Sequence, residues 1–255
     1  MRFLRPVVIL LGLLLVWELV VRLTAAPFYI LPGPGRVAVA WLDSYELILS
    51  HAGVTVTEIL LGLAIGVALG SAAAIVIGHF RGMRRWLLPI LVASQAIPVF
   101  TLAPLLVLWI GYGMASKVAM ATLIIFFPVT ASFLDGLRRT EPGWLDLART
   151  MTQGRPGGRW AELRHIRIPA ALPALASGIR VATAVAPIGA VVGEWVGSGA
   201  GLGYMMLQAN ARMQVDVMFA ALFLLALFAV ALYAAVDAGL RWALPWQAED
   251  AGFEP

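Results

Sequence analysis

Long apolar stretches dominate this sequence and restrict its fold more than any other feature. A helix needs about 20 mostly apolar residues to cross a bilayer. Six segments meet that length, at 7–23, 54–80, 86–111, 115–136, 172–195 and 215–240. Hydrophobic residues make up 61% of the 255 positions and charged residues only 13%, against about 25% charged in a soluble domain. Because a bilayer offers the backbone no water, each segment must be helical. We predict an all-α, polytopic membrane protein, one domain over 1–255 with six transmembrane helices.

The first apolar segment raises the question of a signal peptide. It is basic at its start and then apolar, as a secretory signal is. However, Glu18 and Arg22 interrupt its end, and no small-residue cleavage site precedes a soluble domain. We therefore expect an uncleaved first span.

The basic residues predict the orientation of the chain. With the N-terminus in the cytoplasm, thirteen of the 18 basic residues lie in inside segments: Arg2, Arg5, Arg81, Arg84, Arg85, Arg138, Arg139, Arg149, Arg155, Arg159, Arg164, Arg167 and Arg241. Four lie outside (Arg22, Arg36, Lys117 and Arg212), and Arg180 lies within a span. Cytoplasmic loops of membrane proteins carry such an excess. We expect both termini and segment 137–171, here called the inner loop, to be cytoplasmic. The net charge of +4 then reflects orientation, and we expect no nucleic-acid partner.

Few ionisable residues fall within the predicted spans: Glu18, Glu58, Asp135, Arg180, Glu194 and Asp237. A charge in hydrocarbon needs a partner, water or the end of a span. Asp135 and Asp237 lie near cytoplasmic ends, where water can solvate them, and Glu18 is placed to meet water or Arg22. Glu194, at the outer end of the fifth span, suits either the lining of a translocation path or an anchor for the following loop.

Glycine and proline mark the helices in different ways. Gly62, Gly66 and Gly70 recur every four residues, a ridge that allows close helix packing in membranes. Prolines interrupt the third and fourth spans and predict kinks there, at positions 89, 98, 104 and 128. The glycine-rich segment 197–203 resembles a phosphate-binding loop in composition but lacks the Gly-Lys-Ser/Thr element. We expect a flexible or close-packed outer turn.

The residue patterns of enzymes and metal sites are missing from the sequence. It contains no cysteine, and its three histidines show no metal-ligand spacing. No Ser-His-Asp or paired-carboxylate pattern is visible. We therefore expect no catalytic residue, no metal ligand and no bound cofactor in this chain.

The inner loop carries the most specific motif. Pro142 suits the first turn of a helix, a glycine-rich break follows at 154–158, and a second helical run spans 160–166. The sequences Asp146-Leu147-Ala148 and Ile166-Arg167-Ile168-Pro169 resemble the two conserved elements of the EAA loop of binding-protein-dependent ABC permeases. Thr152 stands where that motif has glycine, and the loop is about four residues longer around 154–158.

The resemblance extends over nearly the whole chain. Further stretches are similar to the nitrate/taurine/alkanesulfonate branch of these permeases, namely 31–34, 95–105, 109–113, 126–128, 192–195 and 201–204. The stretch 193–212 is most similar to members assigned to thiamine-pyrimidine precursors or related heterocycles.

This resemblance implies a type I ABC importer permease in the bacterial inner membrane. It implies a homodimer, two ATPase subunits that hold ATP and Mg, and a periplasmic binding protein. It also implies that the inner loop docks the ATPase through Trp144, Leu145, Asp146, Leu147, Ala148, Arg149, Thr150 and Pro169. The expected solute is a pyrimidine, a thiamine precursor or a similar heterocycle, and an aliphatic sulfonate, taurine or nitrate is the alternative.

Residues of the translocation path are harder to predict. We predict Gln95, Phe100, Glu194 and Asn210 as candidates. An ion-coupled secondary transporter would show repeated halves and a charged relay at the midplane, and neither is visible. A membrane enzyme is disfavoured because no acid, base and nucleophile come together in the sequence.

Overall fold

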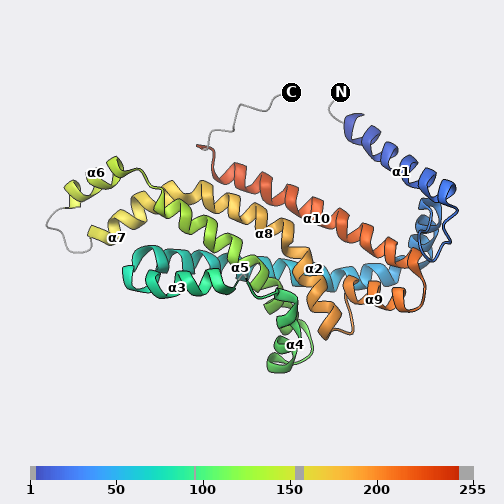
Figure 1. Cartoon of the computed structure of the whole chain (residues 1–255). Coiled ribbons are helices and arrows are strands. Elements are labelled where there is room, and N and C mark those ends of the chain that lie inside the picture. The colour runs from blue at the N-terminus through green and yellow to red at the C-terminus, as the bar shows by residue number, and fades with distance from the viewer. Residues whose placement is uncertain (1–3, 95, 153–157, 247–255) are drawn as a thin grey trace.

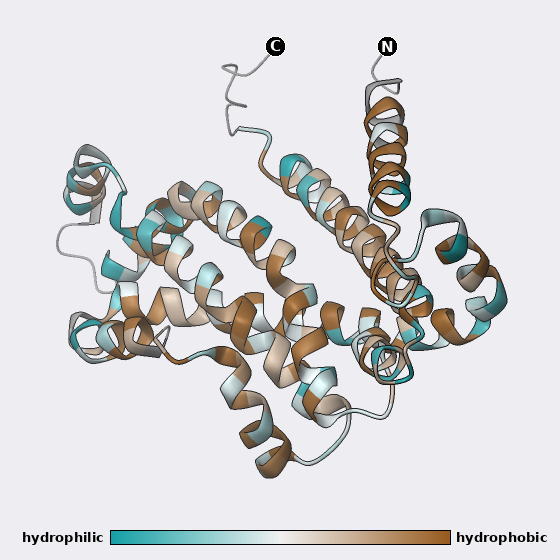
Figure 2. Ribbon diagram, turned by 45° about the vertical axis from the view of Figure 1, so that its right-hand side comes forward, coloured by the Kyte–Doolittle hydropathy of each residue, from teal (hydrophilic) through white to brown (hydrophobic). Residues whose placement is uncertain are grey.

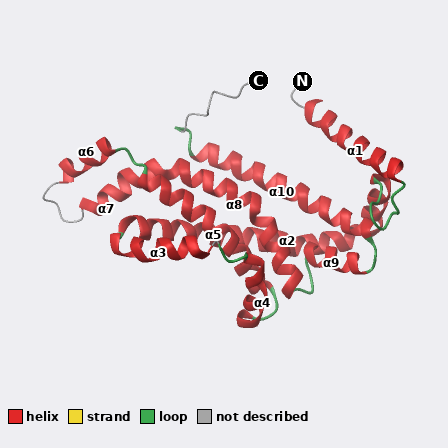
Figure 3. Ribbon diagram, viewed as in Figure 1, coloured by secondary structure: helices red, strands yellow, loops and turns green. Residues whose placement is uncertain are grey.

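A computed structural model describes residues 4–94, 96–152 and 158–246, and every regular element in these ranges is a helix (Figures 1 and 3). The elements are α1 (Leu4–Thr24), α2 (Pro34–His79), α3 (Arg81–Ser94), α4 (Val99–Ile110), α5 (Met114–Arg138), α6 (Pro142–Thr152), α7 (Gly158–Glu162), the π-helix η1 (Leu163–Arg167), α8 (Ile168–Gly197), α9 (Leu202–Ala211) and α10 (Val215–Ala243).

Four helices in the described part are long and apolar enough to cross a membrane: Pro34–His79, Met114–Arg138, Gly158–Gly197 and Val215–Ala243. They contain four of the six predicted spans, 54–80, 115–136, 172–195 and 215–240. The all-α membrane class is therefore confirmed. Figure 2 shows hydrophobic residues along these long helices, whereas hydrophilic residues gather near the end that carries the inner loop.

The first predicted span, 7–23, corresponds to α1, which diverges from the bundle toward its N-terminus (Figure 1). Its Trp17 ring packs on Phe219 and Phe223 of α10, with ring centroids 6.0 and 5.4 Å away. Arg22 Nε lies 2.6 Å from Glu18 Oε1. Glu18 therefore pairs with Arg22, one of the two partners expected for it.

The helix α2 consists of two helical segments that meet at a kink, and the longer one contains the second span. Gly33 precedes α2, and Pro34 occupies its first turn, where the missing N–H costs nothing. Ser44 interrupts α2 with non-helical backbone angles (φ −121°, ψ 15°), so the helical stretch that begins at Pro34 meets the second span at a kink.

The third predicted span, 86–111, is also corrected, because it consists of two helices. α3 ends at Ser94 and α4 begins at Val99, with Pro98 immediately before it. Proline disfavours helical geometry in the residue before it, which explains a full break in place of the expected kink. By contrast, Pro128 lies within α5, which the structure keeps as a single helix.

The bundle is built around α5, which packs closely against α2 and α8. A Cβ built on Gly62 would lie 2.5 Å from Ala121 Cβ, and one on Gly66 would lie 2.5 Å from Ile125 Cγ2. From the other side, a Cβ on Gly189 of α8 would lie 2.8 Å from Ala121 Cα. The predicted glycine ridge is thus confirmed as a packing surface, where small residues let backbones approach.

The sequence suggested that water solvates Asp237, near the cytoplasmic end of its span. In the structure this carboxylate also forms two ion pairs. Its Oδ1 lies 2.7 Å from Arg180 Nε of α8, and its Oδ2 lies 3.0 Å from Arg241 Nη2 one turn along α10. The Arg180–Asp237 ion pair therefore joins α8 to α10.

Candidate coupling loop and translocation residues

The inner loop lies at one end of the bundle, where α6 stands beside α7 (Figure 1). Proline at the first position of α6 favours helix initiation, since its fixed φ suits a first turn. Trp144 and Leu147 are 52% and 60% exposed, and Met151 follows with its side chain also exposed. These residues are three and four positions apart, so they form an apolar stripe on one face of α6.

The other predicted coupling residues take different positions on α6. Asp146, Arg149 and Thr150 have exposed side chains, and Leu145 is half-buried. Ala148 is buried, so its methyl group faces the protein and not the exposed surface of α6. Thr152, at the altered glycine position, ends the helix, and residues 153–157, which include most of the insertion, lie outside the described part.

A cavity of about 360 Å³ opens beside the apolar stripe. It is lined by Trp144, Leu147, His165, Ile166, Pro169, Ala170 and Trp246. The structure therefore brings together three predicted coupling residues. Leu147 comes from the first element of the motif, Pro169 comes from the second, and Trp144 precedes both. Sequence reasoning missed His165 and Trp246, although His165 stands directly before the second motif element.

Ion pairs connect α6 to the helix that follows. Glu162 lies with Oε1 2.9 Å from Arg167 Nε and with Oε2 3.9 Å from Arg149 Nε. Within α6, Arg149 Nη1 donates to Asp146 Oδ1 at 3.1 Å. Glu162 was not predicted, because its partners come from two elements whose relative placement the sequence does not reveal.

The second motif element falls on a widened helical turn. In η1 the Ile168 N–H bonds to the Leu163 carbonyl, five residues back, and Pro169 follows immediately. A proline lacks an N–H, and its ring presses on the carbonyl four residues earlier, so a wider turn relieves that clash. Residues 158–197 still run as one 40-residue helix, with Pro173 and Pro187 inside it, and its length along the helix axis is about 60 Å at 1.5 Å per residue. We call this helix the rod.

The far end of the rod holds Glu194, whose side chain is fully buried. Its Oε1 accepts a hydrogen bond from Thr55 Oγ1 at 2.6 Å, and its Oε2 accepts the N–H groups of Gly203 and Tyr204 at 2.5 and 3.2 Å. These N–H groups belong to the first turn of α9. The N–H groups of a first turn have no acceptor within their own helix. Glu194 therefore anchors the loop after α8, the second of its two expected roles.

The remaining candidates for the translocation path lie elsewhere. Phe100 on α4 and Asn210 on α9 have exposed side chains, whereas Gln95 lies outside the described residues. A shared path for these three residues and Glu194 stays a prediction.

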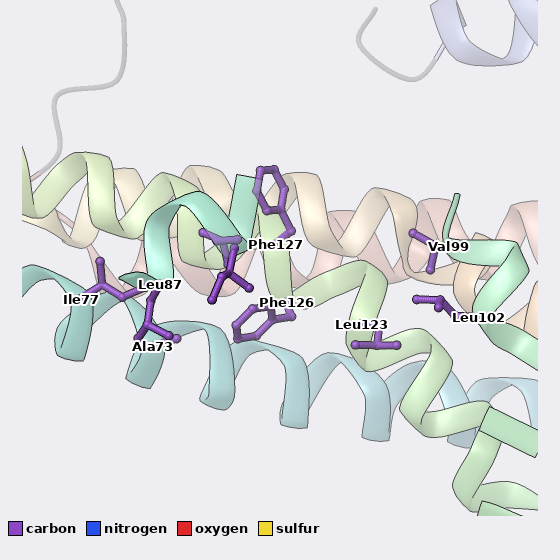
Figure 4. Close-up of a pocket in the computed structure, with 10 residues that line it drawn as sticks. Ala73, Ile77, Leu87, Val99, Leu102, Leu123, Phe126 and Phe127 are labelled. Carbon is purple, nitrogen blue, oxygen red and sulfur yellow. The ribbon is translucent and has the colours of Figure 1, made fainter. Parts of the chain in front are cut away.

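An apolar cavity of about 330 Å³ lies between α2, α3, α4 and α5 (Figure 4). Its lining is Ala73, Ile77, Leu87, Ile90, Leu91, Val99, Leu102, Leu123, Phe126 and Phe127. Among these described residues there is no polar side chain to orient a polar solute, as solute sites usually provide. We therefore do not place the solute there.

Comparison with known proteins identifies the family. Residues 62–247 match the family described as "Binding-protein-dependent transport system inner membrane component". A probable ABC transporter permease of Haemophilus influenzae is 53% identical over 92% of this chain and 95% of its own length. The formylaminopyrimidine transport permease ThiX of Halalkalibacterium halodurans is 36% identical over 96% of both chains. An inward-facing structure of the MetNI methionine ABC transporter shares the fold, with a TM-score of 0.67 at 18% identity over 78% of this chain and 97% of that chain. This protein belongs to the binding-protein-dependent inner-membrane permease family, and it is the permease subunit of an ABC importer.

Proposed function

We propose that this permease works as a homodimer, with two ATPase subunits bound at the inner loops and a binding protein that delivers solute to the opposite face. In this arrangement ATP and Mg are bound by the ATPase subunits, and both termini of the permease are cytoplasmic. The family assignment supports these partners. The arginine distribution supports the orientation, because the inner loop and its neighbouring segments carry most of the basic residues.

The observation that carries the docking proposal is the exposed apolar stripe of α6. Trp144, Leu147 and Met151 project from the most polar part of the chain, outside the predicted spans. Bilayer contact does not explain such exposure, and apolar patches of this kind mark interaction surfaces. A short amphipathic helix whose apolar face enters a partner's groove is a common recognition mode. The adjacent cavity beside Pro169 offers space for a side chain of the ATPase in return.

The docking proposal is tested by replacing the stripe. Leu147→Asp and Trp144→Ala should each weaken ATPase binding by about 2 kcal/mol, as a central interface residue does, which is roughly 30-fold in Kd. The measurement is the amount of ATPase that co-purifies with tagged permease in detergent, together with ATP-driven uptake in proteoliposomes.

The control is Trp109→Ala, which removes an equally large exposed ring from α4, a helix that contributes no residue to the lining of the cavity. It should leave co-purification unchanged. Full ATPase binding by both stripe variants would show that α6 is not the docking helix. Replacing Ala148 is a poor test, since its buried methyl group reports on packing.

We propose a heterocyclic solute for this importer. Two relatives named for heterocycles, the formylaminopyrimidine permease and the riboflavin permease of Chloroflexus aurantiacus, are each 36% identical over at least 95% of this chain. A putative aliphatic sulfonates permease of Bacillus subtilis is 30% identical over 83% of this chain, and the taurine permease of Escherichia coli is 28% identical. The greater similarity to the first pair supports a pyrimidine or related ring.

The solute is tested most directly on the partner binding protein. Its thermal stability should rise with pyrimidines or related heterocycles, because a ligand that binds only the folded state stabilises it. Uptake of the same compound should depend on ATP and on this permease. Stabilisation by taurine or alkanesulfonates alone would contradict the assignment, and uptake driven by a proton gradient without ATP would contradict the importer arrangement.

A further inference from the structure

A buried cluster of ionisable residues lies at the opposite end of the bundle from the inner loop. We call the end that carries α9 the outer end. Lys117 Nζ of α5 lies 2.5 Å from Glu58 Oε1 of α2, and the two side chains are 5% and 0% exposed. The same ammonium group donates to Ser198 Oγ at 3.0 Å, in the loop after α8. One buried lysine therefore joins three parts of the fold: its own helix α5, α2 and the loop after α8.

Glu194 fastens the fourth part, α9, to the same cluster. The first four N–H groups of a helix need partners outside it, and all four are satisfied here. Gly201 N–H, at the N-cap, donates to His51 Nδ1 at 2.9 Å, Leu202 N–H donates to Thr55 Oγ1 at 2.7 Å, and those of Gly203 and Tyr204 donate to Glu194. A carboxylate is favoured at this position by the helix dipole.

The glycine-rich loop is shaped to admit that carboxylate. A Cβ on Gly203 would lie 2.8 Å from Glu194 Oε2, and one on Gly201 would overlap the carboxylate carbon. Gly201 also has a φ of +119°, which favours glycine. By contrast, a Cβ on Gly199 of the same loop would meet no atom within 4 Å. The loop that resembles a phosphate-binding loop in composition thus holds a carboxylate of the protein itself.

These contacts have a mechanical consequence. Separating buried charges in a low-dielectric interior is costly, and a membrane offers no water in exchange. The middle of α2, the outer ends of α5 and α8 and the first turn of α9 are joined by such charges and by the hydrogen bonds of Glu194. They should therefore remain together while other parts of the bundle move.

We infer that Glu194 is a positioning residue of the transport cycle. Together with Thr55 and the Glu58–Lys117 ion pair, it joins the middle of α2, the outer ends of α5 and α8 and the first turn of α9 into one rigid unit at the end of the rod. This inference rests on the proposed function, since the ATPases at the inner loop supply the motion. The rod then carries that motion to the outer face as a displacement of the whole unit.

The chain has no cysteine, so an engineered disulfide gives a direct test. A Cβ on Gly193 of α8 would lie 3.5 Å from Met120 Cβ of α5, within the range of about 3.5–4.5 Å for disulfides. Gly193→Cys with Met120→Cys, oxidised in the assembled transporter, links two members of the unit. The oxidised protein should retain ATP-driven uptake within about twofold of the reduced protein. Loss of uptake on oxidation, restored by reductant, would show that the unit separates in each cycle and would overturn the inference.

A second test addresses Glu194 itself. Glu194→Gln keeps the volume but removes the charge that holds α9, and Gly203→Ala displaces the carboxylate. Both should lower the solute transported per ATP hydrolysed by about tenfold, the order expected for loss of one interaction of about 1.4 kcal/mol, while ATP hydrolysis continues. Gly199→Ala, the matched control, should keep the wild-type ratio. An unchanged ratio in Glu194→Gln would contradict the positioning role, and if that variant does not fold, the disulfide decides.

Co-purification separates this inference from the docking proposal. Glu194→Gln and Gly203→Ala should bind the ATPase normally, because their changes lie at the opposite end of the rod from α6. Both conclusions are supported if the stripe variants lose the ATPase and the oxidised disulfide variant keeps its uptake. Normal ATPase binding in the stripe variants contradicts only the docking proposal, whereas loss of uptake in the oxidised protein contradicts only the rigid unit.

Discussion

Lys117→Met should be among the most destabilising single changes in this chain. The substitution leaves an apolar side chain of similar length and removes the cation from Glu58, whose carboxylate is fully buried. Lys117 Nζ lies 2.5 Å from Glu58 Oε1, and no further hydrogen bond to the Glu58 oxygens is present within the described part, so Lys117 is the main compensation for this carboxylate. Removing one partner of a buried ion pair costs about 3–5 kcal/mol.

The assay is thermal unfolding of the purified permease in detergent, followed by the fluorescence of its nine tryptophans. At about 2–4 °C per kcal/mol for a chain of this size, the expected decrease in Tm is about 6–20 °C. The double variant Lys117→Met with Glu58→Gln should recover most of the loss. No charge then stays buried without a partner, and an apolar or neutral pair is often as stable as the ion pair it replaces.

Two results would refute this reasoning. A decrease of less than about 2 °C for Lys117→Met, equivalent to roughly 1 kcal/mol or less, would mean that water or another group compensates Glu58. A double variant as unstable as the sum of the single variants would mean that the two side chains do not interact, since independent sites add.

Two further predictions concern contacts between helices and use the same unfolding assay. Gly66→Ala should destabilise the permease by about 1–3 kcal/mol, because its Cβ would lie 2.5 Å from a side-chain carbon of α5. Gly53→Ala on the same helix is the control: it adds a methyl group to open space and should not destabilise the permease. Arg180→Ala should cost about 1–2 kcal/mol by breaking the partly buried α8–α10 ion pair with Asp237, whereas Arg241→Ala, 57% exposed and paired within one helix, should cost under about 0.5 kcal/mol.

Most of the helices follow from the sequence because apolar length alone decides whether a segment can span a membrane. The ends of α5, α8 and α10 lie within a few residues of the ends of their predicted spans. The break between α3 and α4 does not follow in the same way. The apolar pattern continues through Ile97 and Val99, and a proline can either kink a helix or end it, depending on the packing of its surroundings.

The candidate sites were predictable only as far as local pattern reaches. The EAA resemblance placed Trp144, Leu147 and Pro169 in one functional segment, and they line one cavity. It did not distinguish the buried Ala148 from its exposed neighbours. The partners at the outer end were invisible, since Thr55 and Glu194 are 139 residues apart and Lys117 is counted by position as an exposed outer charge.

Flexible and rigid features are distributed unevenly along the rod, and the distribution suits a coupling element. Near the inner loop, the π turn at Leu163–Arg167 replaces ordinary helical hydrogen bonds, and such turns often mark functional positions. There Arg149 of α6, with a side chain 61% exposed, lies 3.9 Å from Glu162 of the rod, a contact that exchanges with water at little cost. At the other end, the side chains of Glu194 and its partner Thr55 are both fully buried. A motion of α6 should therefore change the geometry at the inner end, where contacts are cheap to remake, and displace the outer end without deforming it. The two ends of α8 thus differ in the way that their different tasks require, although the same apolar run encodes both.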